Sequence, residues 1–98
     1  MYVVVNRISV DPDRAEDFAE IFAASMAHLE GVPGLSRSLL LAPAKPGQPF
    51  MSTMEFDTSE DFRAWLKSDS FRASHDAVTA DQGVTGNEVE LYDLHTTV

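Results

Sequence analysis

The sequence contains no cysteine, and this absence excludes several kinds of chemistry. Without a thiol, the chain cannot form disulfides, thiolate metal sites, iron–sulfur clusters or a cysteine nucleophile. Basic residues are also scarce, because 7 Lys and Arg stand against 16 Asp and Glu, giving a formal net charge of -9. This balance argues against binding to nucleic acid, whose phosphates need clustered cations, and against docking on anionic membranes.

Long apolar segments are missing as well. At the N-terminus only residues 2–5 are continuously apolar before Asn6 and Arg7, which is too short for a signal peptide or a membrane span. We therefore expect a cytoplasmic protein with no membrane partner. Since 44% of the 98 residues are hydrophobic and no long linker interrupts them, we expect one domain over residues 1–98.

Apolar periodicities predict four strands and two helical segments. Strands are expected at residues 2–10, 35–42, 50–57 and 88–95, the first helix between Asp11-Pro12 and Gly31, and the second from Thr58 to about Val78. This βαββαβ order is typical of the ferredoxin-like, split βαβ fold, an α+β architecture with both helices on one face of an antiparallel sheet. Residues 80–87, which include two glycines, are expected to form a loop.

Capping signals indicate where the helices begin. Asp11-Pro12 combines an N-cap residue with proline at the first helical position. Thr58 followed by Asp61 resembles a capping box in which Asp replaces the usual Glu. The polar residues 68–70 interrupt the second helix and are expected to cap its continuation.

The first strand is apolar on both of its sides. Val4, Ile8 and Val10 point to one side, and Val3 and Val5 point to the other. A strand with this pattern is expected to be buried on both faces, but the helices cover only one. The simplest cover for the second face is the sheet of another copy, so we expect a two-fold homodimer.

Three side chains are candidates for chemistry, and each has a structural alternative. Asn6 is the only amide in an apolar row of the first strand, either a satisfied core amide or a donor aimed into a pocket. Trp65, the only tryptophan, is either core or the wall of a ligand site. His75 shares a helix face with Phe71 and Val78, either as a satisfied core histidine or as a ligand to a metal or haem iron.

Other kinds of site find no support in the sequence. His28 and His95 lie far from His75 and do not show the spacing of a zinc site. Residues 83–86 contain two glycines but precede a predicted strand instead of following one, so they do not indicate a phosphate loop.

One segment resembles a known family. The second helix carries Trp65-Leu66-Lys67-Ser68-Asp69-Ser70-Phe71-Arg72-Ala73-Ser74-His75, which is similar to the motif of the bacterial iron-regulated (surface determinant G-like) haem-degrading monooxygenases. These enzymes belong to the antibiotic biosynthesis monooxygenase superfamily of dimeric α/β barrels. The resemblance extends to Asn6-Arg7 and to the Pro33-Gly34-Leu35 turn, and it covers essentially the whole chain. It implies a dimeric α/β barrel that degrades haem.

The resemblance implies a role for each matching residue. His75 is expected to be the proximal ligand, with its neutral imidazole bound to the haem iron. Asn6 is expected to donate a hydrogen bond on the distal side, and Trp65 to press on the porphyrin and buckle it. Haem would be both cofactor and substrate, with O2 as the oxidant and an external reductase as the electron donor.

Further residues are expected to complete this haem site. Haem is a large apolar disc, and Phe22 and Phe71, together with Tyr2 and Phe62, are expected to surround it. The propionates need a cation in a chain this acidic, and Arg72, one turn before the expected iron ligand, is the candidate.

Two alternatives share the expected fold. Cofactor-independent monooxygenases of aromatic polyketide pathways position a phenolic substrate that itself activates O2, and they need no iron ligand. Asn6 and Trp65 are compatible with either enzyme, so His75 is the residue that separates them. The second alternative is a non-catalytic haem-binding dimer, because a fold does not determine a function.

Overall fold

The computed structural model describes residues 1–77 and 83–98, and it describes no side chain for residues 75–77. Its sheet has 4 strands in the order β2-β3-β1-β4, and every neighbouring pair is antiparallel. The strands are β1 (Tyr2–Val10), β2 (Leu35–Leu41), β3 (Phe50–Phe56) and β4 (Val84–Asp93). This topology confirms the predicted ferredoxin-like α+β fold.

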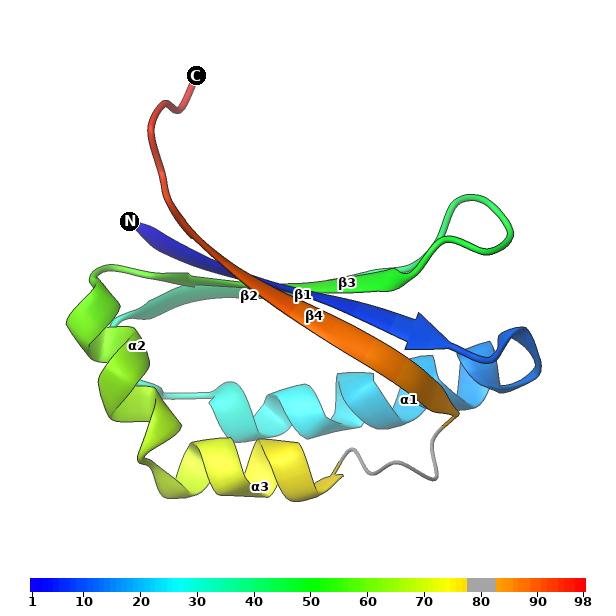
Figure 1. The fold of residues 1–98 in the computed structure, drawn as a ribbon. Helices are drawn as coiled ribbons and strands as arrows, with labels where there is room; N and C mark the ends of the chain where they lie inside the picture. The colour runs from blue at the N-terminus through cyan, green and yellow to red at the C-terminus, as the bar shows by residue number, and fades with distance from the viewer. Residues whose placement is uncertain (78–82) are drawn as a thin grey trace.

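The helical segments lie together on one face of the sheet (Figure 1). They are η1 (Pro12–Arg14), α1 (Ala15–Ser25), η2 (Met26–Leu29), α2 (Ser59–Leu66) and α3 (Asp69–Ala77). None of the described helices is long and apolar enough to cross a membrane. In the described part of the chain, the opposite face of the sheet carries no helix.

The capping signals act where the sequence places them. The Asp11 carboxylate accepts a hydrogen bond from the Asp13 N–H at 3.0 Å, and the first turn is the 3-10 helix η1. The Thr58 hydroxyl accepts from the Asp61 N–H at 3.1 Å and donates to the Asp61 carboxylate at 2.9 Å. The Ser68 hydroxyl accepts from the Phe71 N–H at 3.2 Å, so the predicted interruption does cap α3.

The predicted start of the last strand is wrong. β4 begins at Val84, so the expected loop at 80–87 is strand from Val84 onward, and residues 80–82 of that loop lie outside the described residues. Pairing with β1 overrides the local signal of Gly86, which lies opposite Ser9. The register shifts between Ser9 and Val10, and such a bulge accommodates a glycine within a strand.

The buried core is divided into two clusters on the helix-covered side of the sheet. One cluster contains Val4, Met54 and Phe56, and the other contains Ile8, Phe18 and Phe50. Asn6 of β1 and Ser52 of β3 are paired in register, and along both strands they fall between the two clusters. The centre of the helix-covered face is therefore polar, with apolar packing to either side.

A glycine beside α2 provides a test of how firmly that helix is anchored. Gly31 and Gly34 both have φ 77°, but a Cβ on Gly34 would lie 2.3 Å from the Asp61 carboxylate, whereas a Cβ on Gly31 would meet nothing within 4 Å. We expect Gly31→Ala to cost about 1–2 kcal/mol through backbone strain, and Gly34→Ala to cost more because it also displaces the α2 cap. Urea unfolding measures both losses, and equal losses would contradict a fixed Asp61.

Candidate active site

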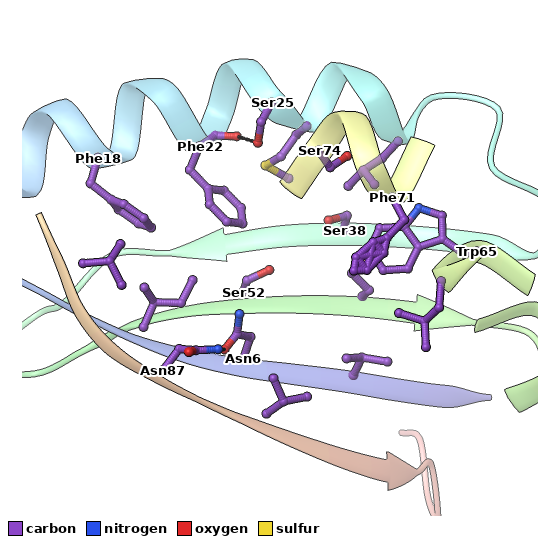
Figure 2. Close-up of a pocket in the computed structure, with 18 of the residues that line it drawn as sticks. Asn6, Phe18, Phe22, Ser25, Ser38, Ser52, Trp65, Phe71, Ser74 and Asn87 are labelled. Atoms are coloured by element: carbon purple, nitrogen blue, oxygen red, sulfur yellow. Dashed lines mark hydrogen bonds between the residues drawn. The ribbon is translucent and has the colours of Figure 1, made fainter. Parts of the chain in front are cut away.

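A cavity of about 660 Å³ lies between the sheet and the helices (Figure 2). Its volume is in the range of small-molecule binding sites. Most of the described residues that line it are apolar or aromatic, and none of them is charged. Leu66 and Val89 line the cavity while being 43% and 56% exposed, so the cavity opens to solvent beside them. This arrangement suits a ligand with a neutral, apolar body.

The structure brings most of the expected site residues together. Asn6 from β1, Phe22 from α1, Trp65 from α2 and Phe71 from α3 all line the cavity. Each of these residues comes from a different element, so the fold alone assembles them. Their roles toward a ligand stay predictions.

Three expected residues are placed differently. Tyr2 does not line the cavity; it packs against a buried core cluster, with its ring centroid 5.7 Å from that of Phe62, which does line the cavity. Arg72 does not line the cavity; it is an exposed residue whose guanidinium group pairs with the Asp69 carboxylate. The backbone of His75 belongs to α3, but its side chain lies outside the described residues, as does the whole of Val78. The iron-ligand role of His75 and the propionate role of Arg72 therefore stay predictions.

The aromatic wall of the cavity is built around Trp65. Its ring stacks on Phe71 with centroids 5.0 Å apart and an interplanar angle of 20°, and it also contacts Phe56 at 6.0 Å. The indole Nε1 donates to the Ser70 hydroxyl at 3.2 Å, and that hydroxyl donates to the backbone carbonyl of His28. Trp65 is thus both part of the packed core and part of the cavity wall, with its polar end satisfied.

Four small polar residues cross the floor of the cavity, one from each strand (Figure 2). We call Asn87, Asn6, Ser52 and Ser38 the polar row. The Asn87 Nδ2 donates to the Asn6 Oδ1 at 3.3 Å, and Ser52 is the cross-strand partner of Asn6. The Ser38 Oγ is buried without a hydrogen-bond partner among the described residues, as is the Ser74 Oγ on the helix side.

Sequence reasoning found only one member of this polar row. Asn87 was missed because it was assigned to a loop, and the serines were missed because a single serine in a strand carries no functional signal. One clue was present, since Ser52 interrupts the apolar row of β3 just as Asn6 interrupts that of β1. Only the register shows that the two interruptions are neighbours.

Charged groups gather on the opposite face of the sheet. Arg7 pairs with Glu90 at 2.7 Å, and the Tyr92 hydroxyl donates to Glu90 at 2.9 Å. The hydrogen bond from Arg7, followed by that from Tyr92, lowers the pKa of Glu90, and bonding to Glu90 raises the pKa of Arg7 and of Tyr92. Within the described ranges, no three His, Asp or Glu residues gather as a metal site.

Comparison with known sequences identifies the family. The profile of the family described as "Antibiotic biosynthesis monooxygenase" matches residues 1–77. The chain belongs to this family. Membership confirms both the resemblance found in the sequence and the expected class of enzyme, a monooxygenase.

One similar sequence and one similar solved structure add to this result. The chain is 35% identical over 95 residues to a haem oxygenase (staphylobilin-producing) of Staphylococcus saprophyticus, covering 91% of this chain and 90% of that relative. Among solved structures, the haem degrader MhuD of Mycobacterium tuberculosis, with two haems bound in its active site, is similar with a TM-score of 0.84 and 23% identity, covering 100% of this chain and 99% of that chain.

A second structure is similar in fold but different in chemistry. SnoaB of Streptomyces nogalater, a cofactor-independent oxygenase, has a TM-score of 0.78 and 24% identity, covering 99% of this chain and 95% of that chain. At such identities, the likeness to MhuD and to SnoaB shows the fold alone. Both classes of enzyme considered from the sequence are therefore found on this fold.

Fluorescence can test the hydrogen bond between Ser70 and the indole of Trp65, because Trp65 is the single tryptophan of the chain. We expect Ser70→Ala to shift the emission of Trp65 and to lower the free energy of unfolding by about 1 kcal/mol, since it leaves a partly buried N–H without its partner. Ser68→Ala is the control, because it removes a helix cap without touching the indole N–H. Identical emission shifts in both variants would show that Ser70 does not hold the ring.

Proposed function

We propose that this protein is a haem-degrading monooxygenase that binds haem through His75 and opens the porphyrin ring with O2 and electrons from an external reductase, releasing iron. The observation that carries this proposal is the 35% identity over 95 residues to the Staphylococcus saprophyticus haem oxygenase. That relationship spans 91% of this chain and 90% of the relative.

The described cavity residues fit haem as a substrate. The cavity of about 660 Å³ has aromatic walls, including the stacked Trp65 and Phe71 rings, which match the flat apolar faces of a porphyrin. Its polar atoms are neutral, and the buried hydroxyls of Ser38 and Ser74 have no hydrogen-bond partner among the described residues. Polar groups left unpaired in this way are available to a ligand or to water that accompanies it.

The bound haem would supply an iron that binds and reduces O2. The chain's own residues contribute position and hydrogen bonding: Asn6 offers an amide on the floor of the cavity, and Trp65 offers a ring that Ser70 and Phe71 hold in place. Because the hydrogen bond to Ser70 and the stacking on Phe71 restrain the Trp65 ring, it can press on a porphyrin without moving, which is the role proposed for Trp65.

The propionates of haem would extend toward solvent in this arrangement. None of the described residues lining the cavity is charged, and the exposed Leu66 and Val89 mark its opening. Carboxylates placed there keep their hydration, which avoids the cost of burying a charge. Arg72 is exposed on α3 and stays the proposed cation, although it would have to leave Asp69 to reach them.

We also propose that two copies pair through the sheet face that carries no helix. Val5, Thr53 and Leu39 lie in register on that face, and Leu41 is 46% exposed there in the single chain. Arg7 with Glu90 flanks this apolar centre on one side. Apolar side chains with charged groups at their margin are typical of a protein interface.

A haemin titration tests the proposed function. We expect a saturable Soret band and quenching of Trp65 fluorescence, followed by bleaching when ascorbate is added in air. We expect His75→Ala to lose this band or to change it grossly, because the imidazole is the proposed iron ligand. Arg63→Ala, on an exposed position of α2, is the control that should bind as the unmodified chain does.

Each contrary result of the titration points to a different function. An unchanged spectrum in His75→Ala would mean that His75 is not the ligand. Without any saturable band, the proposal fails and a cofactor-independent oxygenase acting on phenolic substrates takes its place. Binding without bleaching, also with an enzymatic electron donor, would indicate a haem-binding dimer that does not turn over.

Sedimentation tests the proposed dimer. We expect the unmodified chain to sediment as a dimer and Val5→Lys to sediment as a folded monomer, because the substitution places a cation at the centre of the apolar face. Ala23→Lys adds the same charge at an exposed position of α1 and should remain dimeric. A dimer that survives Val5→Lys would exclude this face as the interface.

A further inference from the structure

We infer that Asn87 is a positioning residue that fixes the orientation of the Asn6 amide, so that Asn6 presents a hydrogen-bond donor to the cavity. The inference deepens the proposed function, because it assigns the polarity of the group that would face a ligand on the floor of the site. It rests on the geometry of two strands that are distant in the sequence and adjacent in the sheet.

The two asparagines are diagonal neighbours on the same face of the sheet. Asn6 of β1 lies opposite Val89, and Ile8 lies opposite Asn87, so the two amides are one pleat apart on neighbouring strands. The Asn87 Nδ2 donates to the Asn6 Oδ1 at 3.3 Å, and both side chains point toward the cavity in Figure 2. No other residue from β4 is bonded to the Asn6 side chain within the described chain.

This hydrogen bond determines which end of the Asn6 amide is available. An amide has an oxygen that accepts and a nitrogen that donates, and the oxygen of Asn6 is engaged by Asn87. The Asn6 Nδ2 is therefore left to face the cavity (Figure 2). If Asn6 alone turned over, two NH2 groups would face each other without an acceptor between them, so Asn6 can turn only if Asn87 turns too.

The orientation matters because the unpaired Ser38 and Ser74 hydroxyls of the lining can either donate or accept, so they impose no fixed polarity on a ligand. Among the described lining residues, the Ser25 hydroxyl already donates to the Phe22 carbonyl at 2.6 Å, and the Thr85 hydroxyl donates to the Ser9 carbonyl at 3.2 Å. A donor at Asn6 favours a ligand atom that carries lone pairs or negative charge, whereas an oxygen there would repel it. Asn87 thus determines whether a ligand meets the NH2 donor or the oxygen acceptor of Asn6.

Substitution of Asn87 tests the assignment, because different replacements demand different orientations of Asn6. Asn87→Asp provides a carboxylate that can only accept, so Asn6 must turn to donate to it and would present its oxygen to the cavity. Asn87→Leu removes the partner without adding charge and leaves Asn6 free to adopt both orientations. Glu88→Ala is the matched control, because Glu88 is the next residue of the same strand but lies opposite Arg7 on the other face of the sheet and does not line the cavity.

The first readout needs no haem. Side-chain amide signals of Asn6, assigned by their loss in Asn6→Ala, are followed in proton–nitrogen correlation spectra of the full chain. We expect the Asn6 NH2 protons to shift downfield and to exchange more slowly in Asn87→Asp, because they become bonded to the carboxylate. They should be unchanged in Glu88→Ala. Unchanged Asn6 signals in both Asn87 variants would overturn the inference.

The second readout reports on a ligand in the site. In the haem-loaded, reduced protein with carbon monoxide, a nearby donor lowers the C–O stretching frequency and a nearby oxygen raises it. We expect the C–O stretching frequency to rise in Asn87→Asp. In Asn87→Leu we expect the C–O band to split, with one component closer to the frequency seen in Asn6→Ala. Glu88→Ala should leave the band in place, and a band that stays fixed in both Asn87 variants would contradict the inference.

The two readouts separate the inference from the proposed function. If the chain binds no haem, the proposed function fails while the amide spectra still decide whether Asn87 orients Asn6. If haem binds but neither the amide signals nor the C–O band responds to Asn87, the positioning role fails and haem binding stands. Asn87 is an exposed residue of an edge strand, so its variants are expected to fold.

Discussion

The pairing of β1 on both of its sides is the constraint on which the rest of the structure depends. β1 is held by β3 along one edge and by β4 along the other, so the register of this one strand decides which residues of three strands are neighbours. Through that register Asn6 lies opposite Ser52 and diagonal to Asn87. Alternate residues of a strand point to opposite faces, so a shift of the β1 pairing by one residue would move Asn6 to the face without helices. The polar row would then lose its continuity.

The same register divides the apolar interior. Val4 and Ile8 lie on either side of Asn6 and belong to separate buried clusters, so the helices pack firmly at the two ends of the sheet and leave the cavity over the middle. The buried packing and the cavity thereby occupy different parts of one face. The charges of the chain follow the same separation, since the Arg7–Glu90 pair lies on the other face and the described cavity lining is neutral.

Sequence patterns correctly predicted the features that depend on residues close together in the sequence. The helix caps at Thr58 and Ser68 and the βαββαβ order are local signals, and the structure confirms them. The start of β4 was wrong because Gly86 suggests a loop locally, while its pairing with Ser9 is a contact between residues far apart in sequence. Asn87 was missed for that reason. The motif that ends at His75 predicted the family correctly, which the comparisons confirm, but the iron ligand itself stays a prediction.

A cavity at the centre of so small a protein has a consequence for the lifetime of the chain. The cavity lies between the two buried clusters, so an occupant that filled it would add packing contacts between them. By mass action, an occupant present at 100 times its dissociation constant would add about 2.7 kcal/mol to the folded state. A protein that consumes its own occupant would lose that support with each turnover, so its resistance to proteolysis would follow the supply of substrate.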